Sequence, residues 1–431
     1  MVIDVEFIEI LIIVVSCLFL FVSAIKDRSA CSPYVTFNIV WVLVGILLAI
    51  GDCHIYQPSV SAVLVILIGV IGFNLSIVFP RFTINGKRLL VKEGARVFLA
   101  GRCRILATVL VICSIIVSSS SILMLASGSG LSDIRLNYYS AAGPLWMYYL
   151  KNYFLLPGTD AVIVASIISF IRQEKEARSL LVLSVILVLL RAISSGGRYV
   201  LINTLFMVLC ALALFKALSN LSPKKKVVLF VLIFAFSLLV IVFTNSRTTV
   251  NTESMSLFEK LYFTVYSYFA GSVTYLSEVV SVFPQVEGST FGACAIGGFI
   301  TPIFAVLSFL KIMPYPAFMN VVGTYACTQL AIGPASFYNA MPTAFGYFFF
   351  DGSFIGVFLE ALIFGYICNR TYRVAQSGNL LFVAFYIVIF VQMCMISTRW
   401  FFFTPDSALV FFYLAFLFRL SGKDSCLQKQ V

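Results

Sequence analysis

Long apolar stretches constrain the fold of this chain more than any other feature. A transmembrane helix needs about 20 consecutive, mostly apolar residues, and eleven stretches come close to that length. Charged residues make up 11% of the 431 residues and the mean hydropathy is +1.04, whereas soluble chains carry about 25% charged residues. The sequence therefore predicts a polytopic membrane protein. The stretches are 7–25, 34–50, 59–79, 105–127, 153–171, 179–195, 199–218, 227–244, 342–369, 379–397 and 404–420.

The same stretches indicate helices rather than strands. They are too long and too continuously apolar for a membrane β-barrel, whose strands alternate between apolar and polar residues. A helix satisfies its backbone hydrogen bonds internally, which hydrocarbon surroundings require. We therefore expect an all-α fold of about 11 transmembrane helices that form a single polytopic membrane domain over residues 1–431.

The lysines and arginines between these stretches predict the orientation in the membrane. The N-terminal segment before the first stretch has no Lys or Arg, whereas Lys26 and Arg28 follow that stretch and seven basic residues lie within 81–104. Basic loops stay in the cytoplasm, so we expect an extracytoplasmic N-terminus and a cytoplasmic C-terminus. The net charge of +11 is then mostly that of cytoplasmic loops, and it predicts no nucleic-acid partner.

Residues 245–341 form the longest departure from the regular pattern of spans. The charge count places them outside the cytoplasm. An aromatic run and a glycine-rich run within this region carry few charges, which is typical of helices that lie at the membrane surface. We expect an extracytoplasmic loop with interfacial helices, and residues 291–310 could also cross the membrane.

Several separate segments together resemble a known family of enzymes. They are an early KDRSACSP loop before a span with Trp41, a Ser-Ser-Gly-Gly-Arg turn at 194–198, Tyr-Ser-Tyr-Phe-Ala-Gly at 266–271, and Tyr338-Asn339 followed by FGYFFFDGSFIGVFLEALIFG at 345–365. In this order, and in a chain of this length, they resemble the oligosaccharide repeat-unit polymerases, the Wzy-type O-antigen polymerases, along most of the sequence.

This resemblance implies a bacterial inner-membrane glycosyltransferase with an architecture related to that of the C-type glycosyltransferases. Such an enzyme joins polyprenyl-diphosphate-linked oligosaccharides into an O-antigen or capsule on the extracytoplasmic face. The implied partners are the lipid-linked oligosaccharide and membrane lipid, with a chain-length regulator and a flippase as further implied partners. No cofactor is implied.

Arginines on the expected outer side suit this chemistry. The enzyme must bind two lipid diphosphates and stabilise one of them as the leaving group. Arginine suits this task because its planar guanidinium holds two oxygens at once and stays charged. Arg198 ranks first, because the turn before it opens a helix whose N–H groups can face an anion. Arg247, Arg135 and Arg399 are the further candidates for binding diphosphate. Each of them could instead be an interfacial anchor.

The acceptor hydroxyl also needs a base. The only histidine, His54, reads as a plain loop residue, so carboxylates are the candidates. Glu278 and Asp351 lie in largely apolar stretches, where loss of hydration would make them stronger bases. Asp351 could equally cap a helix or pair with an arginine.

Sugar contacts are predicted for Tyr266, Tyr338 and Asn339, although an interfacial aromatic belt would also explain outer tyrosines. The outer segments show no close Asp/Glu cluster or DxD-like pair, so no metal is predicted and arginine would take its place.

Three other functions remain open. An O-antigen ligase shares the polytopic architecture and the long outer loop, but we would expect a prominent histidine in that loop, and residues 245–341 contain none. A lipid-linked oligosaccharide flippase would show repeated halves, which this sequence lacks. A non-enzymatic membrane scaffold is the third alternative.

The charge bias makes a direct prediction about topology. Reporters fused after Arg104 or Lys226 should report a cytoplasmic location, and reporters fused near Gly130 or Val250 should report the external side. The opposite pattern would move Arg198 and Arg247 to the cytoplasmic face and remove them from the proposed site.

Overall fold

The structure is a computed structural model, and it describes most of the chain. The described residues are 5–27, 29–51, 54–78, 99–130, 145–195, 197–216, 256–286, 289–316, 330–334, 336–338 and 342–427, with a few single positions at 133–134, at 322 and between 223 and 238. By internal contacts the chain divides into two compact units, a division within the single membrane domain that the sequence predicts. Unit 1 holds residues 1–84, 251–372 and 392–405, and unit 2 holds residues 85–250, 373–391 and 406–431.

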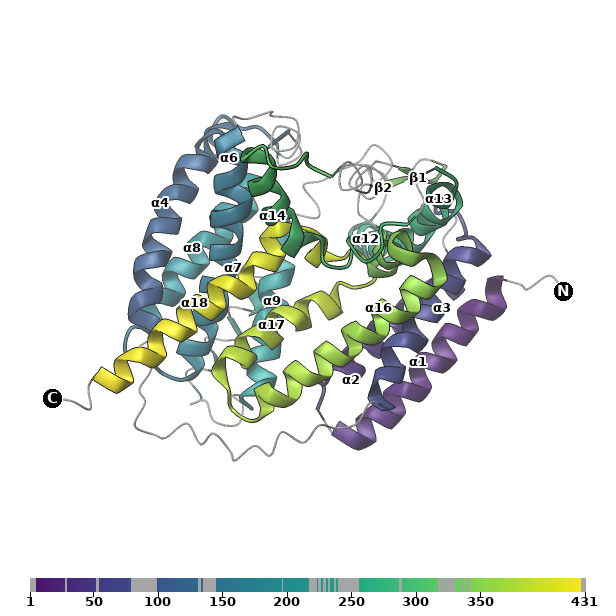
Figure 1. Cartoon of the computed structure of the whole chain (residues 1–431), viewed down its shortest axis with the longest axis horizontal. Helices are drawn as coiled ribbons and strands as arrows, with labels where there is room; N and C mark the ends of the chain where they lie inside the picture. Colours follow the sequence, from purple (N-terminus) through teal and green to yellow (C-terminus); the bar gives the residue numbers. More distant parts are fainter. Residues whose placement is uncertain are drawn as a thin grey trace. The chain divides into compact units, whose positions relative to one another are not determined.

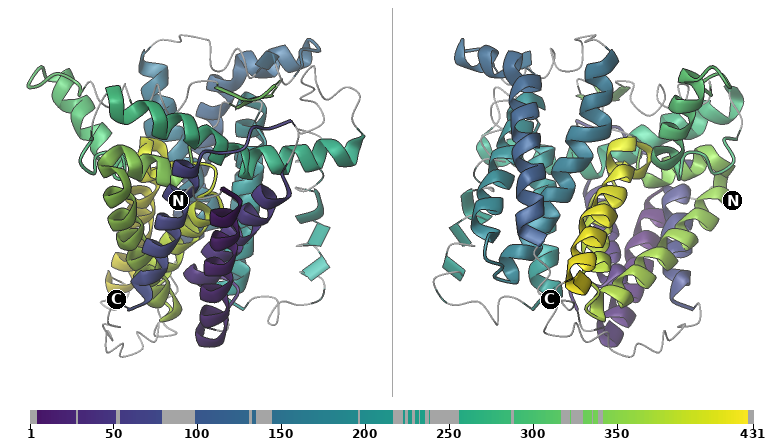
Figure 2. Two further views of the ribbon diagram at one scale, coloured as in Figure 1. Left: turned by 90° about the vertical axis from the view of Figure 1, so that its right-hand side faces the viewer. Right: turned by 60° about the vertical axis from the view of Figure 1, so that its left-hand side comes forward.

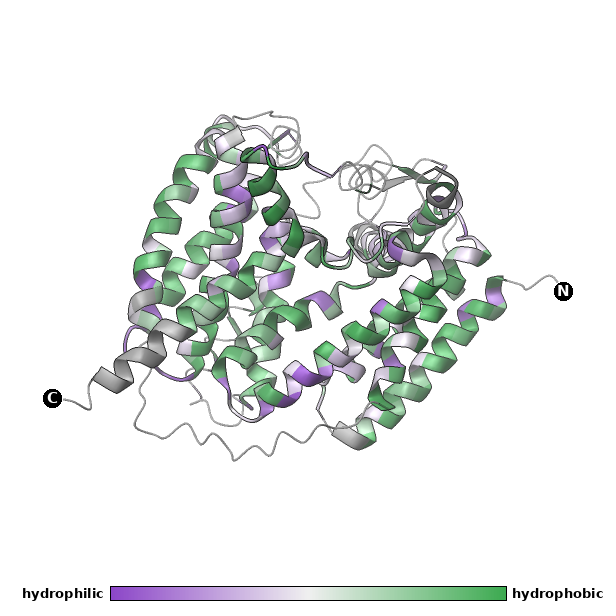
Figure 3. Ribbon diagram, in the orientation of Figure 1, coloured by the Kyte–Doolittle hydropathy of each residue, from purple (hydrophilic) through white to green (hydrophobic). Residues whose placement is uncertain are grey.

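The expected all-α polytopic fold is confirmed. Seven helices of the described residues are long and apolar enough to cross a membrane, and four shorter apolar helices accompany them. Each predicted stretch except 227–244 lies on one of these helices, and 227–244 lies largely outside the described residues. Figure 3 shows hydrophobic residues along most of the length of these helices.

Unit 1 is built on three N-terminal helices and a long late helix. The helices α1 (Val5–Asp27), α2 (Pro33–Ile50) and α3 (Val60–Leu75) pack on one another, and α16 (Ala344–Gln376) lies against α3 (Figure 1). Short polar caps set their limits: the Ser32 side chain accepts the Val35 N–H, and the Ser59 side chain accepts the Ala62 N–H. Such caps satisfy N–H groups that have no partner within the helix.

Buried amides hold α2 to α3. Asn38 Nδ2 donates to Asn74 Oδ1 at 2.7 Å, and Asn74 Nδ2 donates back to Asn38 Oδ1 at 3.0 Å. Beside this pair the rings of Phe37 and Phe73 stack at 3.7 Å between centroids. Reciprocal bonds satisfy both amides where no water can reach, which makes the pairing of these two helices specific.

Glycines let α16 approach α3 closely. A Cβ on Gly72 would lie 2.6 Å from the carbonyl oxygen of Phe358, and a Cβ on Gly365 would lie 2.5 Å from that of Phe73. Real Cβ atoms do not reach such distances. Small residues at both contact points therefore fix this helix crossing, as is common in membranes.

The predicted late loop contributes a separate layer to unit 1. It contains α12 (Leu257–Phe269), α13 (Gly271–Val286), α14 (Gly297–Phe309) and a hairpin of β1 (Leu330–Gly333) and β2 (Ser336–Tyr338). Figure 2 shows α12 and α13 running crosswise to α1. A capping box begins α12, in which Ser256 and Glu259 each accept the other's backbone N–H, and this bonding lowers the pKa of Glu259. The hairpin was not foreseen from the sequence.

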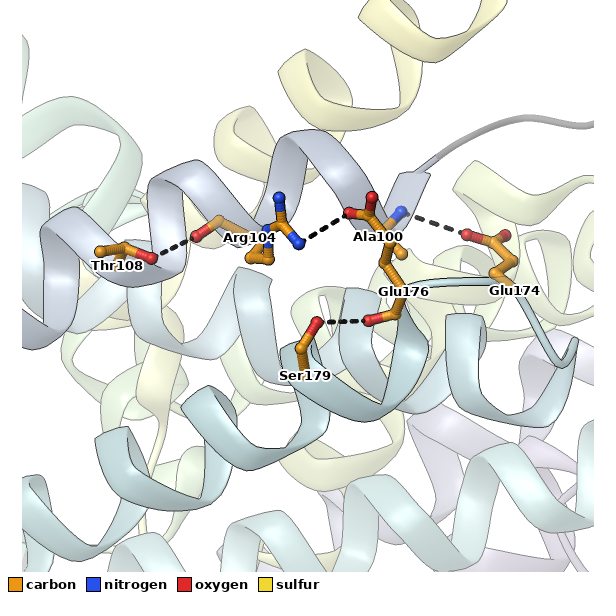
Figure 4. Close-up of polar contacts among 6 residues, drawn as sticks. All are labelled: Ala100, Arg104, Thr108, Glu174, Glu176 and Ser179. Carbon is orange, nitrogen blue, oxygen red and sulfur yellow. Dashed lines mark hydrogen bonds and ion pairs between the residues drawn. The ribbon is translucent and has the colours of Figure 1, made fainter.

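Unit 2 contains the remaining helices. They are α4 (Leu99–Ala126), α6 (Leu145–Tyr149), the π-helical turn η2 (Leu150–Leu155), α7 (Leu156–Ile171), α8 (Ala177–Ser195), α9 (Tyr199–Leu214), most of α17 (Leu380–Cys394) and α18 (Pro405–Leu427). The segment before α8 caps α4 (Figure 4): Glu174 accepts the Ala100 N–H at 3.1 Å, and Glu176 pairs with Arg104 at 3.5 Å. The positive end of the α4 helix dipole also stabilises carboxylates at this position.

The amide pair gives a prediction about stability. Asn38→Ala should lower the unfolding free energy by about 1–2 kcal/mol, because Asn74 loses the donor to its Oδ1 in an apolar setting and keeps only its bond to the Val70 carbonyl. The double variant with Asn74→Ala should lose less than the sum of the two single variants. Thermal unfolding in detergent measures both, and Asn152→Ala is the control, since Asn152 donates to Tyr148 of its own helical segment. Additive losses would contradict direct coupling of the two amides.

Candidate functional site

The helix α16 breaks inside its apolar span. Gly352 is extended and Ser353 has a φ of 53°, a left-handed conformation that costs a non-glycine residue of order 1–3 kcal/mol. The break frees the carbonyls of Phe350 and Asp351. They accept the N–H groups of Thr290 at 2.9 Å and Phe291 at 3.1 Å. A second segment of chain thus satisfies the broken helix, as backbone within a membrane requires.

The carboxylate of Asp351 organises the same segment. It is 3% exposed, and it accepts the N–H of Cys294 at 2.9 Å, the N–H of Ala295 at 2.7 Å and the hydroxyl of Thr290. Its oxygens therefore hold the turn that leads into α14. Of the three roles that the sequence left open for Asp351, namely base, cap and partner of an arginine, these bonds fit the cap.

Two neighbours of Asp351 complete its surroundings. Glu360, farther along α16, lies close enough to interact with Asp351 electrostatically. The thiol of Cys294 lies 3.1 Å from the hydroxyl of Thr290. Burial, reinforced by the charge of Asp351, raises the pKa of Cys294. The thiol therefore stays protonated and does not act as a nucleophile.

Trp400 joins this turn to the segment that carries Arg399. Its indole Nε1 donates to the carbonyl of Ala295 at 2.9 Å, and its ring packs edge-on against Phe348 and Phe364. The tryptophan is 4% exposed. The turn 289–296 is therefore held from two sides, by Asp351 on its N–H groups and by Trp400 on a carbonyl.

A glutamine fixes the backbone beside Arg399. Gln392 Nε2 donates to the carbonyl of Arg399 at 3.1 Å, and Gln392 Oε1 accepts the N–H of Phe401 at 2.8 Å. The guanidinium carbon of Arg399 lies 4.4 Å from the centre of the Phe401 ring, a distance at which a cation is attracted to the ring face. Gln392 was missed from the sequence; its signal was a lone amide within an apolar run.

A cavity of about 330 Å³ lies in unit 1, between the loop after α2 and the crosswise helices α12 and α13. Thr274 Oγ1 donates to the carbonyl of Tyr56 at 2.9 Å, and the Tyr56 N–H donates to Ile332 of β1 at 2.7 Å. We call the cavity beside these two bonds the tyrosine cavity. It is lined by Leu48, Ile50, Gly51, Ile55, Tyr56, Gln57, Pro58, Tyr266 and Thr274.

The other residues of unit 1 that the sequence predicted for the site lie at separate places. Tyr266 is buried and lines the tyrosine cavity. Glu278 is exposed on α13, so the expected loss of hydration is wrong: its position on the outer face of an amphipathic helix keeps it in contact with solvent. Tyr338 lies in β2, paired with Leu330. Asn339 lies outside the described residues.

Unit 2 carries Arg198 and a cluster of four charges. Arg198 stands directly before α9, as predicted, and is 8% exposed. Arg191 pairs with Asp160 at 2.5 Å. Lys151 and Asp406 interact electrostatically with this pair. Arg135 and Arg247 lie outside the described residues.

The described residues were searched for a metal site, and the chain was compared with known proteins. Across the described part of the chain, no group of three or more His, Cys, Asp or Glu residues is placed to hold a metal ion. Comparisons with protein-family models, curated proteins and solved structures find no match.

The role of Asp351 can be tested by hydrogen exchange. Asp351→Ala removes the acceptor for two buried N–H groups, which costs about 1–3 kcal/mol each, so exchange at Cys294 and Ala295 should speed up about tenfold or more. Asp351→Asn should have a smaller effect, because the amide keeps one acceptor oxygen. Mass spectrometry of peptides covering 290–296 measures this exchange.

Glu278→Gln is the matched control, since Glu278 is an exposed carboxylate of the same unit. It should leave exchange at Cys294 and Ala295 unchanged. Unchanged exchange in Asp351→Ala would show that the turn does not depend on this carboxylate.

Proposed function

We propose that this protein polymerises polyprenyl-diphosphate-linked oligosaccharide repeat units into a surface polysaccharide, an O-antigen or a capsule. The reaction takes place on the extracytoplasmic face of a bacterial inner membrane, with the N-terminus outside and the C-terminus in the cytoplasm. The observation that carries the proposal is the bonded outer layer of unit 1, in which the segment 397–401 that carries Arg399, here called the arginine loop, is fixed by Gln392 and by the bond from Trp400 to Ala295.

The hydrogen bonds of unit 1 support a common face for this layer. The loop charges place the segments around residues 56, 272, 295, 332 and 397 outside the cytoplasm, and the bonds join these segments directly. Tyr56 bonds to Ile332, Ser272 to Ser397 at 2.6 Å, and Trp400 to Ala295. An extracytoplasmic reaction needs its parts gathered in this way.

The arginines supply the cations that the leaving diphosphate needs. Arg399 is held on a fixed backbone, and a fixed cation stabilises developing charge without reorganisation. In unit 2, Arg198 is buried before the N-terminus of α9, where backbone N–H groups and the helix dipole also favour an anion. We assign both to lipid diphosphates, and Arg135 and Arg247 remain candidates on sequence grounds.

The acceptor hydroxyl then has one carboxylate with access to solvent among the predicted bases. Asp351 is engaged by the turn 289–296, whereas the Glu278 side chain is exposed. Glu278 is therefore the proposed base. The partners of the reaction are the lipid-linked oligosaccharide and membrane lipid, with a chain-length regulator and a flippase as further expected partners.

Deleting the chain and replacing its arginines tests this function. Cells without the protein should carry a single repeat in place of a ladder of surface glycans. No attached repeat at all would indicate a ligase, and an intracellular build-up of lipid-linked repeat would indicate a flippase. Arg198→Ala and Arg399→Ala should each reduce polymerisation about 100-fold or more, as loss of a fixed donor to a developing charge does.

Two matched variants sharpen this test. Arg198→Lys should restore activity only in part, because Lys keeps the charge but loses the bidentate fork. Arg178→Ala should keep a normal ladder, since Arg178 is exposed in a segment with a predicted cytoplasmic location. A normal ladder from Arg198→Ala, at normal protein abundance, would make Arg198 an interfacial anchor.

A further inference from the structure

The tyrosine cavity has the size of a small-ligand site. Cavities that hold small molecules begin at about 300 Å³, and this one measures about 330 Å³. The side chain of Tyr56 is 52% exposed at its wall, so a ligand can enter from solvent. We propose that the tyrosine cavity binds a neutral pyranose ring of the glycan, an assignment that rests on the proposed function for the ligand being a glycan.

The lining favours a sugar over other small ligands. Tyr56 offers an exposed aromatic ring, on which the apolar face of a pyranose ring can pack, and the buried Tyr266 forms part of the wall. Gln57 offers an amide that both donates and accepts hydrogen bonds, and Thr274 offers its hydroxyl oxygen as an acceptor, since its hydrogen is donated to Tyr56; hydroxyl-rich ligands need both kinds of partner. Aromatic surface beside a few placed polar groups is the usual design of an orienting site.

The absence of charge from this lining narrows the choice further. Among the residues that the structure describes, which leave out 52 and 53, the nine that line the cavity include no Lys, Arg, His, Asp or Glu. An ion that leaves water for such a site loses hydration without gaining a partner, and this is costly. The cavity therefore suits a neutral hexose or an N-acetylated sugar, and it disfavours a uronic acid, a diphosphate or a phospholipid headgroup.

Hydrogen bonds to main-chain atoms of the loop 54–59 hold the cavity in shape. The carbonyl of Tyr56 is bonded by Thr274, and its N–H is bonded to Ile332. The hairpin sits directly against this loop, because a Cβ on Gly333 would fall 1.8 Å from the carbonyl oxygen of His54. The Ser59 N–H donates to the hydroxyl of Ser277 at 2.8 Å. A wall fixed in this way presents a preorganised site.

One helical turn connects the cavity to the arginine loop. On α13, Thr274 bonds the cavity wall at Tyr56, while Ser272, two residues earlier, bonds Ser397. Ser397 belongs to the same segment as Arg399. A sugar ring in the tyrosine cavity would therefore be bound on the same rigid element as the loop that we assign to diphosphate.

The test measures binding of simple sugars to the whole protein. Purified protein in nanodiscs is titrated with methyl glycosides of glucose, galactose, mannose and N-acetylglucosamine, with glucuronic acid as the charged probe. Binding is followed by saturation-transfer-difference NMR. At least one neutral glycoside should bind, at least tenfold more tightly than glucuronic acid. Tyr56→Ala and Gln57→Ala should each weaken its binding at least tenfold, whereas Tyr56→Phe should retain most of it.

The matched control is Tyr366→Ala, which removes an exposed tyrosine of α16 in the same unit and should leave binding unchanged. Binding by none of the neutral glycosides would overturn the assignment, as would binding that the Tyr56 and Gln57 variants leave unchanged, or a preference for glucuronic acid. Glycerol-1-phosphate is included as a headgroup probe, and tighter binding of it than of every glycoside would also overturn the assignment.

This outcome is separable from that of the proposed function. If neutral sugars bind in the tyrosine cavity while deletion of the chain leaves the glycan ladder intact, the cavity assignment stands and the polymerase fails. If deletion removes the ladder while no sugar binds at Tyr56 and Gln57, the polymerase stands and the cavity assignment fails.

Discussion

The rest of the structure depends on one constraint: backbone N–H and C=O groups need partners where no water is available. Continuous helices meet this requirement internally, but α16 does not remain continuous. At Gly352 and Ser353 its own hydrogen bonds are interrupted. The N–H groups of Thr290 and Phe291 bond the freed carbonyls, and the carboxylate of Asp351 in turn accepts the N–H groups of Cys294 and Ala295. The break thereby docks part of the late loop onto a spanning helix. Trp400 donates a hydrogen bond to Ala295 of this docked segment. The docked segment therefore also fixes the loop that carries Arg399.

Charge in the apolar bundle of unit 2 follows a related rule. An isolated ion in a bilayer interior costs several kcal/mol, and removing one partner of a buried pair costs about 3–5 kcal/mol because the other stays unpaired. Asp160 and Arg191 meet this rule as a direct pair, and Lys151 and Asp406 add one charge of each sign. The cluster is balanced, so it explains these four residues without a ligand.

The sequence predicted the helices well because length and hydropathy decide them. Each apolar stretch that the structure describes became a helix, and the aromatic run after residue 256 became α12 and α13. Arg198 was correctly placed at a helix start, since a Gly-Gly turn precedes it. The partners were beyond reach, because they join positions far apart in the chain: the carboxylate of Asp351 to Cys294, and Gln392 to the backbone of Arg399. Glu278 failed for a local reason, since an apolar neighbourhood in sequence does not say which face of α13 a residue occupies.

Main-chain atoms and side chains have different roles at the tyrosine cavity of unit 1. The frame around the tyrosine cavity is made largely by main-chain atoms, since Tyr56 contributes its N–H and carbonyl to it while its side chain stays exposed. The chemistry at the cavity surface comes from side chains that the frame does not use, such as those of Tyr56 and Gln57. Under the proposed assignment of this cavity to a sugar, replacing these side chains changes which sugar fits without loosening the loop that holds Arg399. An enzyme that handles a particular repeat unit needs this separation, because the diphosphate is common to all such substrates while the sugars differ.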